Sequence, residues 1–212
     1  MPVFNFSVDE EYAKKHNELL KDTRRLQLSA LLFALVQLAI GVSVYLFVGG
    51  GLGWIVLAVF GVMALVSLAL IFVIPQQVGD AAKLYGTYEL VPAVIAKVNP
   101  RDLTVMALVN INVDPTAAPS YGLATRTITR LEGHERKVGE RVPAVAVTGR
   151  RSTHAQTTWD QISPMPTAWG TPDKATVARA EKEIPADLWA LLEKNIDKVD
   201  DVATTRYDLL PL

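Results

Sequence analysis

Two uncharged runs decide the fold of this chain: residues 26–48 (LQLSALLFALVQLAIGVSVYLFV) and residues 52–74 (LGWIVLAVFGVMALVSLALIFVI). Residues 26–74 contain no Asp, Glu, Lys, Arg or His, so every charge of the 212-residue chain lies outside them. About 20 apolar residues in a helix cross the roughly 30 Å hydrocarbon core of a bilayer. A soluble helix pair would instead carry polar faces at a period of 3.6 residues. The sequence therefore predicts a transmembrane helical hairpin over residues 26–75.

The two runs are joined by three glycines at 49–51. Glycine adopts the positive backbone angles that a tight reversal between helices requires, so we expect a short turn here. Pro75 is expected to end the second helix, because proline cannot continue a helix without losing a hydrogen bond.

Basic residues near the membrane ends predict the orientation. Five precede the first run, none lies in the turn, and Lys83 follows the second run. The five are Lys14, Lys15, Lys21, Arg24 and Arg25. Because Lys and Arg favour the cytoplasmic side, we expect a multi-pass protein of the plasma membrane with both termini in the cytoplasm.

The N-terminal region, residues 1–25, is predicted to be a cytoplasmic amphipathic helix that continues into the membrane. Ser7 and Glu10 form an S-x-x-E capping box, which predicts a helix start near Val8. From there the helix is expected to run unbroken to Val48.

Gln37 lies at the middle of the first predicted span. An amide in hydrocarbon needs a hydrogen-bonding partner, so this side chain is expected to face another helix. The partner is either Ser67 or a backbone carbonyl of the second helix, or a helix of another membrane protein.

Residues 76–170 are predicted to form a β-rich cytoplasmic domain. Four short runs rich in β-branched residues are separated by Pro, Gly and Asp turn signals, and a fifth is possible at 153–162. The four runs cover residues 88–98, 103–113, 123–128 and 142–148. The expected fold is α+β: a small antiparallel, barrel-like sheet of the OB-like or SH3-like kind, followed by C-terminal helices.

Residues 171–212 are predicted to hold those helices. Thr171 with Pro172 predicts a helix start, and the helix should end near Glu183. A second helix should follow Pro185 and pack an apolar face on the sheet, and the tail from Asp200 is expected to be irregular. That apolar face comprises Leu188, Trp189, Leu191, Leu192 and Ile196.

Residues 126–151 carry seven basic and three acidic side chains, giving +4, whereas residues 171–212 carry six basic and nine acidic, giving −3. The seven basic residues, here called the basic strip, are Arg126, Arg130, Arg136, Lys137, Arg141, Arg150 and Arg151. Near a membrane such a strip gains about 1 kcal/mol per residue from anionic lipid. It could equally contact an acidic partner or the acidic C-terminal part of the chain, or be a solvated face.

The sequence lacks the patterns of catalytic and cofactor sites. It has no Cys, no P-loop, no G-x-G-x-x-G, no G-x-S-x-G and no H-E-x-x-H. His134 and His154 each have a carboxylate nearby but no nucleophile beside them, so both are expected to be surface residues. No enzyme activity, cofactor or metal is therefore expected. Nucleic-acid binding is disfavoured, because Tyr121 is the only aromatic residue between Leu90 and Arg151.

Residues 137–147 (KVGERVPAVAV) and 164–173 (PMPTAWGTPD), with the preceding hairpin, resemble a family of small actinobacterial membrane proteins of unknown function. In size and layout the chain is also similar to small accessory subunits of the cytochrome bcc–aa3 respiratory supercomplex and to NfeD-type membrane proteins. The resemblance implies no catalytic residues.

Together the residues and the resemblance lead us to expect a non-catalytic accessory or assembly subunit of a larger membrane complex, such as that supercomplex. Its partners would be membrane lipids and other integral membrane subunits. The alternative is a membrane-tethered scaffold that binds anionic lipid or a cell-envelope partner through the basic strip. An enzyme acting on lipids or nucleotides is the least favoured class.

Overall fold

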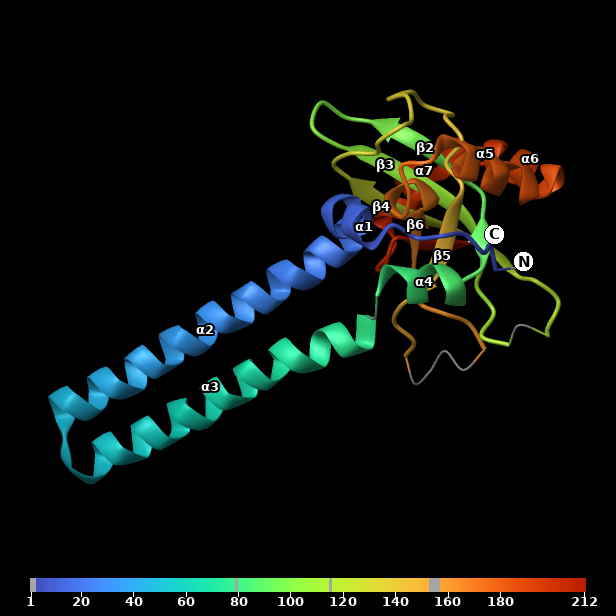
Figure 1. Cartoon of the computed structure of the whole chain (residues 1–212). Coiled ribbons are helices and arrows are strands. Elements are labelled where there is room, and N and C mark those ends of the chain that lie inside the picture. Colours follow the sequence, from blue (N-terminus) through green and yellow to red (C-terminus); the bar gives the residue numbers. More distant parts are fainter. Residues whose placement is uncertain (1–2, 79, 115, 153–156) are drawn as a thin grey trace. The chain divides into compact units, whose positions relative to one another are not determined.

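The computed structural model describes residues 3–78, 80–114, 116–152 and 157–212 (Figure 1). The chain divides into two compact units. One, the β domain, combines Met1–Glu18 with Asp80–Leu212, and the other, the hairpin, is Leu19–Gly79.

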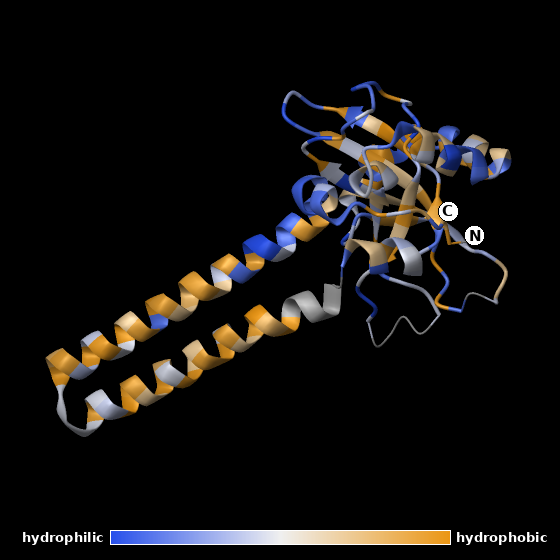
Figure 2. Cartoon of the chain, in the orientation of Figure 1, coloured by the Kyte–Doolittle hydropathy of each residue, from blue (hydrophilic) through white to orange (hydrophobic). Residues whose placement is uncertain are grey.

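The hairpin consists of two long apolar helices, α2 (Glu18–Val48) and α3 (Gly50–Val78). Both are long and apolar enough to cross a membrane, and Figure 2 shows apolar residues over most of the described length of the two helices, with hydrophilic residues at the start of α2. The expected glycine turn is confirmed: Gly49 and Gly50 have φ of 62° and 61°, which favour glycine. Gly51 already belongs to α3.

Small residues line the contact between α2 and α3. Ala34 and Gly41 of α2 and Ala64 of α3 are buried. A Cβ atom at Gly41 would lie 3.0 Å from the Cβ of Phe60, so any larger residue would push the helices apart by a few tenths of an ångström. The Ser67 hydroxyl donates to Oε1 of Gln37 across the same contact, at 3.1 Å. Gln37 is thus bonded within its own hairpin, which was the first of the two expectations for it.

The prediction that Pro75 ends the second helix is wrong, because α3 continues to Val78. Proline has no N–H to bond the carbonyl four residues earlier, which is that of Ile71. This carbonyl instead accepts a hydrogen bond from Nε2 of Gln27 at 2.9 Å. A side chain of the neighbouring helix therefore satisfies the group that proline leaves open, as membrane helices that contain proline require.

The predicted unbroken helix from Val8 to Val48 is also wrong. A short helix, α1 (Glu10–His16), is capped by Asp9, whose carboxylate accepts the Tyr12 N–H at 2.9 Å. Asn17 then adopts an extended backbone (φ −75°, ψ 109°) before α2 begins. Asn17 is fully buried and its amide lies 3.2 Å from Sδ of Met165, so packing within the β domain breaks the helix where local sequence favoured continuation.

In the described part of the β domain, seven strands form two antiparallel sheets. One has the order β1–β5–β6, from Leu90–Val91, Ala144–Thr148 and Ile162–Pro166. The other has the order β2–β3–β4–β7, from Ala93–Val98, Leu103–Asn110, Tyr121–Ile128 and Leu209–Pro211. The α+β class is confirmed, but the sheets are not a closed OB-like or SH3-like barrel. Pro92 divides the expected strand at 88–98, and its two parts, β1 and β2, join different sheets.

Two further strand expectations differ from the structure. The fifth strand, expected at 153–162, begins only at Ile162 as β6, and residues 153–156 lie outside the described part. The tail is not irregular, because α7 (Val199–Thr204) and β7 occupy it. Leu210 pairs with Leu123 of β4. The tail is ordered because β7 adds an edge strand to this sheet.

The C-terminal helices cover the sheet as expected. Helix α5 (Lys174–Glu183) is capped by Asp173 rather than Thr171, and α6 (Ala186–Glu193) follows Pro185. Leu188, Trp189 and Leu192 of α6 are buried in one core with the strand residues Met106, Leu108 and Leu123. The remaining elements are α4 (Ala81–Thr87), labelled in Figure 1, and the 3-10 turns η1 (Thr167–Trp169) and η2 (Ile196–Lys198).

Candidate functional site

A cavity of about 300 Å³ in the β domain, here called the Tyr12 cavity, gathers charged side chains from three separate segments. Its polar lining residues are Tyr12, Glu132, His134, Glu140, Arg141, Thr171, Lys174 and Glu181. Ala168, Pro172, Val177 and Ala178 supply apolar wall. Residues 12 and 181 are far apart in the sequence, so only the fold brings this set together.

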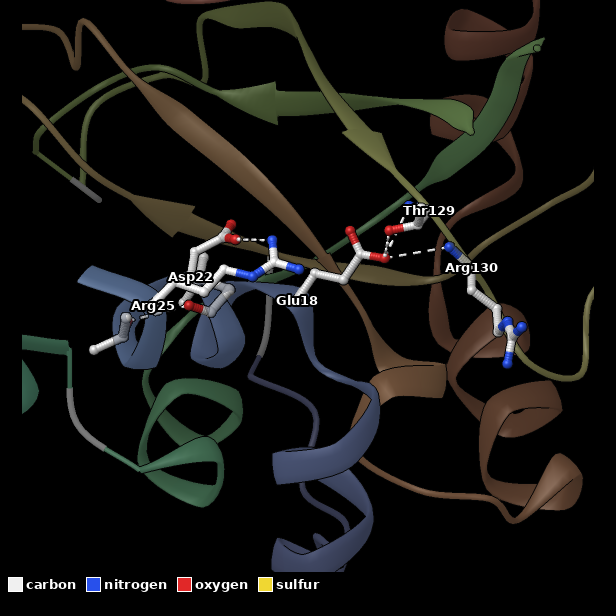
Figure 3. Close-up of polar contacts among 7 residues, drawn as sticks. Glu18, Asp22, Arg25, Thr129 and Arg130 are labelled. Carbon is white, nitrogen blue, oxygen red and sulfur yellow. Dashed lines mark hydrogen bonds and ion pairs between the residues drawn. The ribbon is translucent and has the colours of Figure 1, made fainter. Parts of the chain in front are cut away.

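One wall of the cavity is fixed by Glu18, the first residue of α2. Its carboxylate accepts hydrogen bonds from the Thr129 N–H at 2.8 Å, the Thr129 hydroxyl at 2.6 Å and the Arg130 N–H at 3.2 Å (Figure 3). Thr129 and Arg130 lead directly into the cavity residues Glu132 and His134. We call this three-bond contact the Glu18 clasp.

The start of α1 is held by two hydrogen bonds to other segments of the β domain. The Asp9 N–H bonds the Gly170 carbonyl at 2.9 Å, and the Glu10 carboxylate accepts the Ala82 N–H at 3.0 Å. The second bond satisfies a free N–H in the first turn of α4, whose own N-cap Asp80 makes no side-chain cap bond. Helix α1, which carries Tyr12, is therefore held at both ends.

Burial and nearby carboxylates act together on Tyr12. The pKa of its hydroxyl is raised above the ordinary value of 10.0, first by burial and then by the charges of Glu132 and Asp9. The Tyr12 ring also stacks on His16 with 4.1 Å between ring centroids. Tyr12 is therefore held as a neutral phenol.

Arg141 is the basic-strip residue that enters the cavity lining, and it is already paired. Its guanidinium contacts Glu193 of α6 at 2.7 Å and Glu181 of α5 at 3.7 Å, and lies 5.0 Å from the Trp189 ring centroid. For Arg141 the structure thus shows the contact with the acidic C-terminal part of the chain that the sequence left open.

The other arginines of the basic strip contact separate parts of the β domain. Arg126 donates to the Ser163 hydroxyl at 2.8 Å, and Arg136 donates to the Asn99 carbonyl at 2.8 Å. Arg130 lies 3.6 Å from Glu132. Two more face aromatic rings at 5.7 Å, namely Arg150 over Tyr207 and Arg151 over Trp159.

Of the two histidines with a carboxylate nearby in the sequence, His134 and His154, the structure describes only the first. His134 lines the cavity, with Nδ1 3.3 Å from the carbonyl oxygen of Glu132. His154 lies outside the described residues. Within the described ranges, no group of three or more His, Asp or Glu is placed to hold a metal.

Sequence reasoning missed Tyr12, Glu140, Lys174 and Glu181 as parts of one site. No local pattern could have found them, because they come from three separate segments, with Lys174 and Glu181 both on α5. The one useful sequence signal was the charge difference between residues 126–151 and 171–212. Among the cavity residues it predicted only the contacts of Arg141 with Glu193 and Glu181.

Comparison with known proteins agrees with the expected class. A solved structure described as a "putative membrane protein" from Corynebacterium diphtheriae, an actinobacterium, is 61% identical to this chain, with a TM-score of 0.57. The match covers 58% of this chain and 100% of the solved one. No curated protein matches the chain. Residues 76–200 match the family described as "Protein of unknown function (DUF3239)", and because this is more than half of the chain, it belongs to that family.

Proposed function

We propose that this chain is a non-catalytic, membrane-anchored subunit that binds another integral membrane protein as part of a larger complex. The observation that carries the proposal is the construction of the β domain from both flanks of the hairpin. Met1–Glu18 and Asp80–Leu212 form one compact unit, and the Glu18 clasp lies within it. A domain built from both flanks of its anchor suits a binding role beside the membrane.

The same construction supports a double crossing. One compact unit cannot lie on both faces of a membrane, so the residues before α2 and after α3 share a face. Two helices of sufficient length then cross and return. Because Lys and Arg flank the apolar runs on the domain side, we assign the domain and both termini to the cytoplasm.

A non-catalytic role is supported by how the polar groups of the Tyr12 cavity are used. Arg141 is neutralised by Glu193 and Glu181, and one ring nitrogen of His134 faces a backbone carbonyl. Tyr12 is kept protonated by burial and by nearby negative charge. Nucleophilic catalysis needs a nucleophile within hydrogen-bond reach of a base, and the contacts described for these lining residues are to carboxylates, a stacked ring and a backbone carbonyl instead.

The alternative, a scaffold that binds anionic lipid through the basic strip, has less support. Each arginine of the strip contacts a carboxylate, a carbonyl, a hydroxyl or an aromatic ring of its own domain. The narrower expectation of a bcc–aa3 supercomplex subunit rests on size and layout alone. Contact between lipid and the apolar hairpin is expected in either case.

Purification tests the proposal. The full chain, tagged at its C-terminus and expressed in its native membrane, is crosslinked in intact cells and then purified in mild detergent. We expect a defined set of integral membrane proteins to be crosslinked to it in constant ratio. An unrelated two-helix protein with the same tag is the control. A chain that purifies alone and monodisperse contradicts the proposal.

The absence of cysteine from the sequence allows a clean test of topology. Single cysteines are introduced next to the turn at the start of α3, as Gly51→Cys, and at an exposed position of the β domain, as Ser120→Cys. A membrane-impermeant maleimide should label Gly51→Cys on intact cells and Ser120→Cys only after lysis. Labelling of Ser120→Cys from outside would overturn the assigned orientation.

A further inference from the structure

The Tyr12 cavity combines apolar wall with an excess of negative charge. Ala168, Val177 and Ala178 lie in the same lining as three carboxylates, those of Glu132, Glu140 and Glu181. Its volume of about 300 Å³ is at the lower end of the range for small-molecule sites, roughly 300–1,000 Å³. The cavity therefore suits a single side chain or a small ligand better than a nucleotide or a haem.

The charges of the lining do not balance. Against the three carboxylates stand Lys174 and Arg141. Two neighbours outside the lining also take part: Arg130 lies 3.6 Å from Glu132, and Glu193 lies 2.7 Å from Arg141, which also contacts Glu181 at 3.7 Å. With both neighbours counted, four carboxylates face three cations, so one negative charge remains in excess. Lys174 is exposed at the first position of α5. An occupant that carries positive charge is thus favoured over an anionic one.

We propose that the Tyr12 cavity receives an arginine or lysine side chain of a neighbouring integral membrane protein. Its aliphatic stem lies against Val177 and Ala168, and its cationic end lies near Glu132 and Glu140. Long basic side chains bury their stems on apolar surface while the charged end finds a polar partner, which is the combination that this lining offers. The inference deepens the proposed function and rests on it.

The place of the cavity in the chain favours such a partner. Tyr12 lies six residues before Glu18, and from Glu18 to Leu26, where the uncharged run begins, α2 rises about 12 Å. Cytoplasmic segments next to membrane helices are rich in Lys and Arg. A cavity that accepts a basic side chain at this short chain distance from the membrane therefore meets the residue types that a neighbouring membrane protein presents there.

The titration of Tyr12 agrees with this assignment. Burial and then the charges of Glu132 and Asp9 raise the pKa of the Tyr12 hydroxyl, so negative charge acts on this lining residue. A cation in the cavity would offset this effect and lower the pKa again.

A peptide pair tests the inference on the full chain in phosphatidylcholine nanodiscs. The probe is a fluorescein-labelled Gly-Ser peptide with two arginines, and its counterpart carries citrulline, which keeps the shape and removes the charge. By anisotropy, we expect the arginine peptide to bind at least about tenfold more tightly than the citrulline peptide. The double variant Glu132→Gln/Glu140→Gln should remove this difference. Glu135→Gln, an exposed glutamate outside the lining, is the matched control and should leave it unchanged.

Lys174→Gln should change the affinity for the arginine peptide in the opposite direction. Removing this ammonium from the lining should tighten binding of the arginine peptide by a few fold. Equal affinity for both peptides, or binding that survives Glu132→Gln/Glu140→Gln, overturns the inference. The thermal unfolding midpoint of each variant must match the wild type, and Lys174→Gln keeps the test decisive if the double variant does not fold.

The same variants separate this inference from the proposed function. If the wild type crosslinks to membrane proteins and Glu132→Gln/Glu140→Gln does so equally, the cavity assignment fails and the subunit role stands. If the wild type crosslinks to none, the subunit role fails whatever the peptides show. Loss of a crosslinked partner in the double variant, with retention in Glu135→Gln, supports both.

Discussion

The side-chain amide of Gln27 donates a hydrogen bond to the backbone carbonyl of Ile71, with 2.9 Å between Nε2 and the oxygen. Ile71 is four residues before Pro75, so this carbonyl is the one that a proline at position 75 leaves without its usual partner. Helix α3 is therefore able to continue to Val78 in an apolar environment.

We predict that Gln27→Leu lowers the free energy of unfolding of the hairpin by about 0.5–1.5 kcal/mol, the range of hydrogen bonds between membrane helices. In a Pro75→Ala background the restored N–H should bond Ile71, so the same substitution should cost much less. Unfolding of the full chain in detergent, followed for all four members of the cycle, measures the difference. Equal costs in both backgrounds would show that Gln27 does not compensate for the proline.

Ser67→Ala should destabilise the contact between α2 and α3, because the buried Gln37 amide loses a partner. The cost should be about 0.6 kcal/mol, and the double variant Gln37→Leu/Ser67→Ala should recover part of it, because no polar group then remains unsatisfied. The measurement is the same unfolding transition. Ser43→Ala, on the exposed face of α2, is the control and should have no effect.

Glu18→Ala should open the Glu18 clasp. The backbone N–H groups of Thr129 and Arg130 lose their acceptor, so their hydrogen exchange should be about tenfold faster. Glu11→Ala, an exposed glutamate of α1, should leave these two amides unchanged. Exchange followed by mass spectrometry on peptides that span residues 125–135 measures the effect. Unchanged protection in Glu18→Ala would mean that the clasp does not hold this loop.

Asp173 should contribute to the acid stability of the β domain. Its pKa is lowered from the ordinary value of 3.8, first by the hydrogen bond from the Thr176 hydroxyl and then by that from the Ala175 N–H. Because the folded pKa is the lower one, this stabilisation is complete above pH 3.8 and is lost as the pH falls through the lowered value.

The variant Asp173→Ala should therefore lower the thermal unfolding midpoint at pH 7 and reduce its decrease between pH 5 and pH 2. Asp187→Ala is the control, because this exposed carboxylate of α6 caps no helix. A pH dependence of Asp173→Ala that is identical to that of the wild type would contradict the prediction.

The sequence was sufficient where one strong signal acted alone. Residues 26–74 predicted the hairpin because 49 consecutive uncharged residues have few other solutions, and the three glycines identified the turn. Helical spacing of apolar residues correctly predicted the buried face formed by Leu188, Trp189 and Leu192. Ser67 was named as a partner of Gln37 because few polar groups exist within the second run.

The sequence was insufficient where a distant contact outweighs local preference. Ser7 and Glu10 form a good capping box, yet Asp9 caps α1, and Glu10 bonds Ala82 instead. Pro75 normally ends a helix, but Gln27, 48 positions earlier, satisfies the open carbonyl. The Tyr12 cavity depends on contacts of this kind throughout.

The β domain closes around residues that are synthesised far apart in time. Phe4 packs in the same core as Leu90 and Trp189, and the whole hairpin lies between them in the chain. A growing chain must therefore pass α2 and α3 to the insertion machinery while its first residues still lack their core. The N-terminal segment therefore stays exposed beside the membrane until the strands have been synthesised. If translation stops after α3, the hairpin is inserted but Phe4 has no core to pack in, and we expect this segment to be accessible to proteases.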